Sequence, residues 1–378
     1  MIERPYWLEK IHTSWKRAPI VWLTGVRRIG KTTLVRQLGD IEYINCDLPR
    51  NRSRVEDPEL FFRGVEKAII VFDEVHRLEN PSETLKIGAD EFPKKRILAT
   101  GSSTLAATSK FRDTLTGRKR VIPLLPVLAS ELKQFGIHNL NDRLLHGGFP
   151  QQLLESEPDP EFFGEWLDSY YSRDVQELFA VAKRSEFLKL IELLLRNNGG
   201  FFEVSSLGKQ TGLSRPTVMR YIDILELTHV IHRLAPFHGG AKREITGQPK
   251  IYGVDTGLVS YLRGWETLRP EDRGALLENL VLDELLTLSV GKSVKYWRDK
   301  SGREIDFVLT ETAKSVTAVE CKWSHRSFEI QNLSAFRTHY PKGKNIVVAA
   351  DAGKPFQKRM GDFVIYFSSP ENLRAVIY

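Results

Sequence analysis

The feature that most constrains the fold is a basic loop, bounded by glycines, that directly follows an apolar run. The run is Ile20–Leu23, and the loop reads Gly25-Val26-Arg27-Arg28-Ile29-Gly30-Lys31-Thr32-Thr33. Such a loop between a buried strand and a helix wraps a polyphosphate with its backbone N–H groups. A simple glycine turn is the alternative, but the apolar run before the loop and the helical stretch after it favour phosphate binding. We therefore predict a nucleotide site in the first third of the chain.

The chemistry of this loop assigns roles to its side chains. Lys31 is expected to reach the β- and γ-phosphates of ATP, and the Thr32 hydroxyl is expected to ligate Mg²⁺. ATP and Mg²⁺ are thus the predicted cofactors. The predicted nucleotide-binding residues are Gly25, Arg27, Arg28, Ile29, Gly30, Lys31, Thr32 and Thr33. For Arg27 and Arg28, contact with acids of the helical lid is the alternative to contact with phosphate.

Two acids end a second apolar run. Ala68–Phe72 is followed by Asp73 and Glu74. After a phosphate loop, this pattern predicts that Asp73 holds the Mg²⁺ shell and that Glu74 polarises the attacking water. Having both acids favours repeated hydrolysis over a slow switch.

Three more residues are candidates for the catalytic machinery. Ser102 follows the strand Arg96–Ala99 and is expected between the acids and the γ-phosphate, although a helix cap is the alternative. Arg118 precedes the last strand of the sheet and could reach the γ-phosphate of a neighbouring subunit. Arg173 could do so from a lid. For both arginines, a solvated or salt-bridged side chain is the alternative.

Bulk properties narrow the class of protein. The 378 residues carry a net charge of +7 and only two cysteines, Cys46 and Cys321, too few for a disulfide framework or a metal cluster. The N-terminus lacks a signal peptide, and no apolar stretch is long enough to cross a bilayer. We expect a cytoplasmic protein without a membrane partner, and its basic charge is compatible with nucleic acid.

The pattern of elements predicts four regions. Residues 1–127 alternate short apolar strands with helices, as in a parallel α/β sheet. Residues 128–184 are helical and aromatic and are expected to form a lid. Residues 185–253 predict a winged helix-turn-helix, and residues 254–378 predict a further α/β domain.

The winged helix supplies candidate DNA contacts. Arg215 and Arg220 lie off the apolar stripe of the helix Arg215–Leu227, and Lys242 and Arg243 lie in the Gly-rich segment of the wing. We expect these four residues to contact phosphates more than bases. A role in protein interaction or packing is the alternative.

The last region contains a pattern of acids and a lysine. Asp306 lies on one expected strand, and Glu320-Cys321-Lys322 ends the next, so Glu320 and Lys322 face the same way. If the strands pair, Asp306 and Glu320 converge, and Glu278 could join them. This arrangement resembles the metal-dependent core of restriction-type nucleases. A salt-bridged sheet is the alternative.

An ordered set of short motifs resembles a known family. The motifs are Gly25–Thr33, Asp73-Glu74-Val75-His76, Gly117-Arg118, Gly147-Gly148-Phe149-Pro150, Asp255-Thr256-Gly257-Leu258 and Glu278-Asn279-Leu280. They are similar to those of bacterial and archaeal AAA-type ATPases that carry a C-terminal domain of unknown function. The resemblance implies an α/β protein with a P-loop AAA-like core, a winged helix and a nuclease-like, restriction-endonuclease-like C-terminal domain.

Three functions are compatible with these features. The favoured hypothesis is an ATP-hydrolysing, DNA-remodelling motor of the helicase or translocase kind, working as a homo-oligomer such as a hexameric ring. The second is a metal-dependent nuclease gated by ATP. The third is an ATP-switched regulator that binds DNA or protein, against which the retained Glu74 argues.

Overall fold

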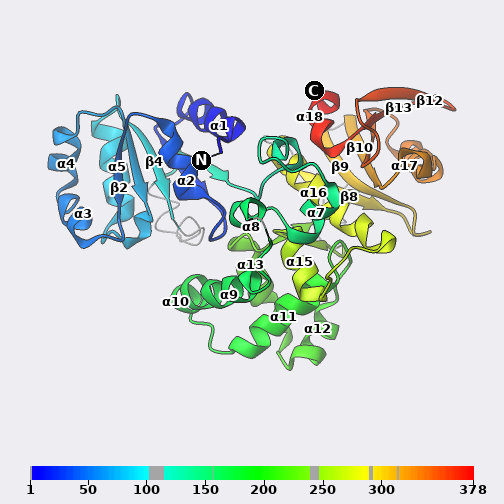
Figure 1. Ribbon diagram of the computed structural model, residues 1–378, viewed down its shortest axis with the longest axis horizontal. Coiled ribbons are helices and arrows are strands. Elements are labelled where there is room, and N and C mark those ends of the chain that lie inside the picture. Colours follow the sequence, from blue (N-terminus) through cyan, green and yellow to red (C-terminus); the bar gives the residue numbers. More distant parts are fainter. Residues whose placement is uncertain (1, 102–114, 156, 239–246, 289–292, 313–314) are drawn as a thin grey trace. The chain divides into compact units, whose positions relative to one another are not determined.

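The computed structural model describes residues 2–101, 115–155, 157–238, 247–288, 293–312 and 315–378. Its contacts divide the chain into two compact units (Figure 1). Unit 1 comprises Met1–Leu125, Glu165–Ala182 and Leu227–Val230, and unit 2 comprises Pro126–Gly164, Lys183–Glu226 and Ile231–Tyr378. Unit 1 is therefore assembled from three separate stretches of sequence.

Unit 1 contains a five-stranded sheet in the order β2-β3-β4-β1-β5, and every pair in it is parallel. The strands are β1 (Ile20–Thr24), β2 (Ile41–Asn45), β3 (Ile69–Asp73), β4 (Arg96–Thr100) and β5 (Lys119–Pro123). This confirms the parallel α/β sheet predicted from the sequence. All five residues of β1 are buried, which explains its uninterrupted apolar run, because helices cover both faces of a parallel sheet.

Helices pack on the two faces of this sheet. On one face, α4 (Pro58–Gly64) and α5 (Pro81–Glu91) bury Phe62 and Leu85 against the strands, and α3 (Pro49–Arg54) precedes them. On the other face, α1 (Pro5–Trp15) contacts β1 and β5. Its buried residues Trp7, Ile11 and Trp15 recur every four positions, as one face of a helix requires. Proline in the first turn of α1, α3, α4 and α5 is suited to a helix start.

The sheet order places three chain segments at one edge. Strands β3, β4 and β1 are neighbours, so the loop after β1 lies beside the C-terminal ends of the other two. Ligands of open α/β sheets bind at this carboxyl edge. The helix that follows the loop, α2 (Lys31–Val35), is only one turn long and continues as a 3₁₀ turn over Arg36–Leu38.

The second stretch of unit 1 packs on the loop after β1. It contains the end of α9 (Phe162–Tyr170), a π-helical turn over Tyr171–Gln176, and α10 (Glu177–Phe179). The Trp166 indole N–H donates to the Arg27 carbonyl at 3.0 Å. Of the segment expected as a lid, residues 165–182 thus belong to unit 1 and the remainder to unit 2.

The first part of unit 2 is mainly helical. Its helices are α7 (Leu140–His146), α8 (Pro150–Leu154), α11 (Arg184–Arg196), α12 (Val204–Thr211), α13 (Arg215–Leu227) and α15 (Thr256–Arg263). The antiparallel strands β6 (Ile231–Leu234) and β7 (Lys250–Gly253) follow α13. The bounds of α13 are those expected from the sequence for the helix Arg215–Leu227.

The second part of unit 2 is built on a six-stranded mixed sheet. The order is β12-β13-β11-β10-β9-β8, with bounds β8 (Val294–Arg298), β9 (Glu304–Thr312), β10 (Ser315–Lys322), β11 (Asn345–Ala349), β12 (Phe356–Met360) and β13 (Phe363–Ser368). One face packs against α16 (Arg273–Leu288) and α18 (Leu373–Ile377). The other face packs against α17 (Gln331–His339). Strands β12 and β13 were not predicted from the sequence.

A buried polar junction explains two of the sequence motifs. The Asp255 carboxylate caps α15 and also accepts from the Gly148 N–H. At Gly147, where φ is +85°, an added Cβ would lie 2.0 Å from Asp255 Oδ1, so only glycine fits. Arg143 is fully buried and donates to the Val127 carbonyl and to Thr256 Oγ1. These motif residues therefore hold unit 2 together.

Candidate nucleotide site

The loop after β1 has a backbone that its glycines permit. Gly25 and Gly30 have φ values of +135° and +94°. A Cβ on Gly25 would lie 2.6 Å from the Leu124 carbonyl oxygen, so a larger residue would collide with the backbone after β5. Ile29 is fully buried and anchors the middle of the loop. The loop is thus held in one position from both ends and from its centre.

Lys31 lies inside the curve of this loop. Its Nζ donates to the Gly25 carbonyl at 2.8 Å and to the Val26 carbonyl at 3.0 Å. Burial lowers the pKa of Lys31, although the nearby acids Glu74 and Asp174 oppose that shift. The ammonium group is therefore held by carbonyl oxygens of the loop itself.

The Asp73 carboxylate accepts hydrogen bonds from three hydroxyl groups, each on a different helix or strand. Thr32 Oγ1 donates to Asp73 Oδ2 at 2.9 Å, and the Tyr43 hydroxyl donates to the same oxygen. Thr100 Oγ1 donates to Asp73 Oδ1. The ring of Tyr43 lies under the Arg36 guanidinium, 5.1 Å from ring centroid to Cζ. These contacts fix the direction of the carboxylate at the end of β3.

Glu74 has an unusual backbone conformation. Its φ of +56° and ψ of +47° are left-handed, which costs free energy for a residue with a side chain and is found mainly at functional sites. The Thr100 hydroxyl stabilises this turn by accepting from the Glu74 N–H at 3.0 Å. The Glu74 carboxylate lies 3.3 Å from His76 Nδ1. Burial lowers the pKa of His76, so this ring is mainly neutral at pH 7.

A small pocket connects these groups. It is lined by Gly25, Val26, Arg27, Lys31, Glu74, Gly101, Tyr170, Asp174 and Thr228. All of these residues belong to unit 1. Asp174 Oδ2 lies 3.7 Å from Arg27 Nε, and burial raises the pKa of Asp174 to about 6.

The comparison with protein families agrees with this geometry. Residues 17–133 match the family model described as AAA domain. This part of the chain is an AAA domain. Two further models, DUF8612 and DUF4143, match residues 137–269 and 273–368, and both are described as domains of unknown function. Neither description names a nuclease, so the nuclease-like part of the sequence prediction stays a prediction.

Similar whole proteins have also been found. Proteins of Mycobacterium tuberculosis and Mycobacterium bovis, both described as uncharacterised, are 26% identical over 320 residues, which is 82% of this chain and 71% of each relative. A Thermotoga maritima RuvB variant is 16% identical, with a TM-score of 0.31, and the match covers 61% of this chain and 90% of RuvB. Cdc6p from Pyrobaculum aerophilum is 12% identical, with a TM-score of 0.27, covering 68% and 92%. TM-scores of this size support no inference about function.

The AAA domain brings together most of the residues predicted to bind nucleotide. The loop residues, Asp73 and Glu74 meet at the carboxyl edge of β1, β3 and β4. Arg27 pairs with Asp174, and Arg28, at a φ of +59°, pairs with Glu165 on the surface. Ser102 lies outside the described residues.

The two predicted catalytic arginines lie apart from this pocket. Arg118 makes a two-point ion pair with Asp90 of α5, with Nε–Oδ1 and Nη2–Oδ2 distances of 2.6 and 3.0 Å. Arg173 is exposed, while its neighbour Asp174 lines the pocket. In this form of the protein, the charged group that the π-helical turn presents to the loop is therefore an acid.

Sequence reasoning missed three residues of the site. Thr100 could have been found, because it ends the strand next to β3, as polar residues at a carboxyl edge often do. Tyr43 gave a weaker signal, a hydroxyl near the end of an apolar strand. For Asp174, the sequence indicated only that Arg27 or Arg28 could contact an acid of the lid, and which acid does so depends on tertiary structure.

In unit 2, the predicted acids lie close together. Asp306 accepts from the Cys321 N–H at 2.7 Å, and the pairing of Phe307 with Val319 places Asp306 beside Glu320. Burial and the charge of Asp306 raise the pKa of Glu278 to about 8 and that of Glu320 to about 7.

Two lysines compensate this acidic cluster. Lys322 Nζ lies 3.0 Å from Glu320 Oε2, and Lys250 pairs with Glu304. Within the described ranges, no group of three or more His, Cys, Asp or Glu residues is arranged to hold a metal ion. The lysines thus take the position of counter-ions to these carboxylates.

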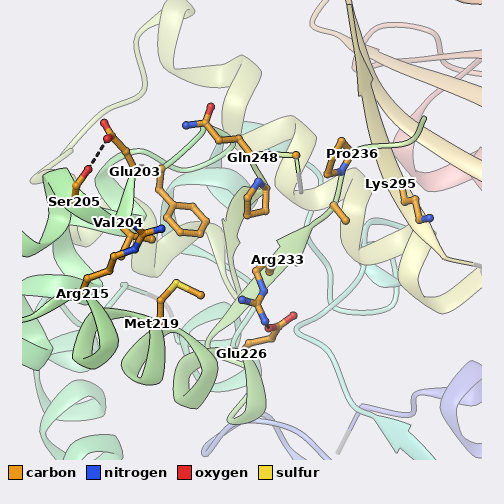
Figure 2. A pocket seen from close by; sticks show the side chains of 14 residues that line it. Glu203, Val204, Ser205, Arg215, Met219, Glu226, Arg233, Pro236, Gln248 and Lys295 are labelled. Carbon is orange, nitrogen blue, oxygen red and sulfur yellow. Dashed lines mark hydrogen bonds and ion pairs between the residues drawn. The ribbon is translucent and has the colours of Figure 1, made fainter. Parts of the chain in front are cut away.

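The predicted DNA contacts are partly described. Arg215 begins α13 and lines a pocket of about 770 Å³ in unit 2, together with Met219 and Lys295 (Figure 2). Arg233, on the opposite wall, pairs with Glu226 and Asp223. Arg220 is exposed on the same helix as Arg215. Lys242 and Arg243 lie outside the described residues.

Two other properties bear on cofactors and location. The Thr32 hydroxyl and the Asp73 carboxylate, 2.9 Å apart, are hard oxygen ligands of the kind that Mg²⁺ prefers. The residues at this edge therefore fit the ion.

None of the described helices has the length and apolar character needed to cross a membrane.

Proposed function

We propose that the AAA domain binds and hydrolyses ATP with Mg²⁺. The observation that carries this proposal is the meeting of Lys31, Thr32, Asp73 and Glu74 at one edge of the sheet. The parallel strands already hold the acids and the loop together at this edge.

Each residue has a role that follows from its chemistry. Lys31 neutralises charge on the β- and γ-phosphates. Thr32 and Asp73 hold Mg²⁺, which offsets negative charge on the phosphates when it is bound. Glu74 accepts a proton from the attacking water.

The test is phosphate release by the purified full chain with ATP and Mg²⁺. Lys31→Ala should abolish release, and Glu74→Gln should lower it by about 10²- to 10⁴-fold while nucleotide binding is retained. Glu79→Gln, a nearby surface change, serves as the control. If the wild-type chain releases no phosphate in any oligomeric state, the proposal fails.

We further propose that ATP hydrolysis drives remodelling of DNA, with α12, α13, β6 and β7 acting as a winged helix. Support comes from the net charge of +7 and from the exposed Arg215 and Arg220 on α13. Duplex DNA should stimulate hydrolysis, and Arg215→Ala should weaken binding about equally for all sequences, because phosphate contacts carry no base information. If DNA leaves the hydrolysis rate unchanged, the motor hypothesis is contradicted.

Assembly into a ring is part of this proposal. The Arg118–Asp90 pair is about one-third exposed on each side, and surface pairs of this kind contribute little to stability because solvent screens them. Arg118 could therefore exchange Asp90 for a neighbour's γ-phosphate at little cost. Light scattering with and without ATP tests the assembly, and Arg118→Ala should slow hydrolysis only in the assembled state.

An ATP-gated nuclease is the less favoured function. Lys250 and Lys322 already neutralise the acids beside Asp306, so a divalent ion would have to displace them. Metal-dependent cutting that Asp306→Ala abolishes, with hydrolysis intact, would reverse this preference.

A further inference from the structure

We propose that Asp174 is an intramolecular competitor of the nucleotide, occupying the phosphate position of the loop until ATP or ADP displaces it. The inference rests on the proposed nucleotide site. It adds that binding must release the segment 165–182 from the loop.

The first argument is the position of the carboxylate. Asp174 lines the same pocket as Lys31 and Glu74, and its Oδ2 lies 3.7 Å from Arg27 Nε. Only 14% of its side chain is exposed. Arg27 and Lys31 are the cations that the loop would offer to phosphate oxygens. An internal anion thus faces the groups that the ligand requires.

The second argument is space. The pocket holds about 20 Å³, enough for roughly one water molecule and far too little for a triphosphate. The Lys31 ammonium is also directed back onto the Gly25 and Val26 carbonyls. A nucleotide can therefore enter only if Asp174 leaves and Lys31 turns outward.

The third argument is that contacts hold residues 165–182 in place, whereas the Asp174 carboxylate itself is weakly held. Trp166 stacks on Tyr170 with a centroid separation of 5.3 Å, and the Tyr170 hydroxyl lies 2.7 Å from Thr228 Oγ1. Asp174 itself lies on a π-helical turn, a feature frequent at functional sites. Its Oδ2 is buried without a hydrogen bond from any described residue.

The charges around Asp174 favour replacement of its carboxylate by the phosphates of a nucleotide. Arg27 and Lys31 attract the Asp174 carboxylate, while Glu74 and Glu177 repel it. A triphosphate carries several negative charges and more acceptor oxygens than one carboxylate, so it can take both cations from Asp174. A permanent structural ion pair would instead be expected to have hydrogen bonds that satisfy the buried oxygen.

The experiment is calorimetric titration of the full chain with Mg·ADP and Mg·ATP. If the contact leaves about one molecule in ten open, Asp174→Asn should tighten binding by about tenfold. Glu66→Gln is the matched control, because it removes an exposed carboxylate of unit 1 that lies outside the pocket and outside residues 165–182. The affinity of this control should stay within about twofold of wild type. Unchanged or weaker binding by Asp174→Asn would overturn the proposal.

Amide hydrogen exchange distinguishes displacement of this segment from a contact that is only structural, because a structural contact would stay in place when nucleotide binds. In the wild-type chain, ADP should increase exchange in residues 171–179, while the loop 25–33 becomes more protected. Lower or unchanged exchange in 171–179 on binding would contradict the release of this segment. If the wild-type chain binds no nucleotide, the proposed function fails; if it binds while Asp174→Asn does not bind more tightly, only this inference fails.

Discussion

Tyr43 makes it possible to test whether Asp73 is held in place for Mg²⁺. The substitution Tyr43→Phe removes one hydroxyl and leaves the ring under the Arg36 guanidinium. The Asp73 carboxylate then keeps two donors, Thr32 and Thr100, instead of three. The change is therefore confined to the orientation of one carboxylate.

The size of the effect follows from the hydrogen bond that is lost. A hydrogen bond to a charged group contributes about 1.5–3 kcal/mol. Because two donors remain, we take the lower end, and about 1.4 kcal/mol corresponds to tenfold in an equilibrium constant. The Mg²⁺ concentration for half-maximal hydrolysis should therefore rise by about tenfold, while the rate at saturating Mg²⁺ changes little.

The assay is phosphate release at saturating ATP over a range of Mg²⁺ concentrations. Tyr6→Phe is the control, because this tyrosine lies on α1 and its hydroxyl accepts from Lys10 at 3.2 Å, away from Asp73. Thermal unfolding of each variant checks that the fold is retained. If the Mg²⁺ dependence of Tyr43→Phe equals that of wild type, Tyr43 does not orient Asp73 and the reasoning is refuted.

Three further predictions concern stability and pH. Burial raises the pKa of Asp174 to about 6, so between about pH 4 and 6 the folded chain keeps a proton that the unfolded chain releases. The free energy of unfolding should therefore fall as pH rises to 6, by on the order of 3 kcal/mol in all and by about 1.4 kcal/mol between pH 5 and 8. Asp174→Asn should lack this part of the pH dependence in urea unfolding at pH 5 and 8. Thr100→Val leaves the Glu74 N–H without its acceptor and should lower the unfolding free energy of unit 1 by about 1–3 kcal/mol, which a melting midpoint equal to that of wild type would contradict. Arg143→Met removes a buried guanidinium from the Asp255 junction and should lower the unfolding free energy of unit 2 by about 3–5 kcal/mol, measured with denaturant. The control Lys133→Met, on the surface, should change this free energy by less than about 0.5 kcal/mol.

The strands of the sheet could be predicted because the polarity of their residues indicates whether each position is buried. The run Ile20–Leu23 is apolar at every position, which a strand covered on both faces requires. Asp73 and Lys31 followed from the same logic, since each directly adjoins such a strand or its loop. Local sequence was sufficient wherever neighbours in the chain are also neighbours in space.

Other features depend on contacts that local sequence does not reveal. Asp174 meets the loop from a stretch more than a hundred residues away, and Thr228 approaches from farther still. The expectation of a contiguous lid followed from a uniform helical composition, which carries no information about the switch between units at Gly164 and Glu165. Counter-ions show the same limit: that Lys250 would neutralise Glu304 is a matter of tertiary packing.

The three-part make-up of unit 1 has a consequence for how this protein can be cut or recombined. Residues 17–133 carry the AAA match, yet Trp166, Asp174 and Thr228 also line or brace the phosphate loop. A fragment ending near residue 133 would lose one side of that pocket and the contact of Trp166 with the Arg27 carbonyl. This domain therefore cannot be exchanged as one continuous stretch of sequence. A chimera that replaces the C-terminal half must keep Glu165–Ala182 and Leu227–Val230 from the same protein as the AAA domain.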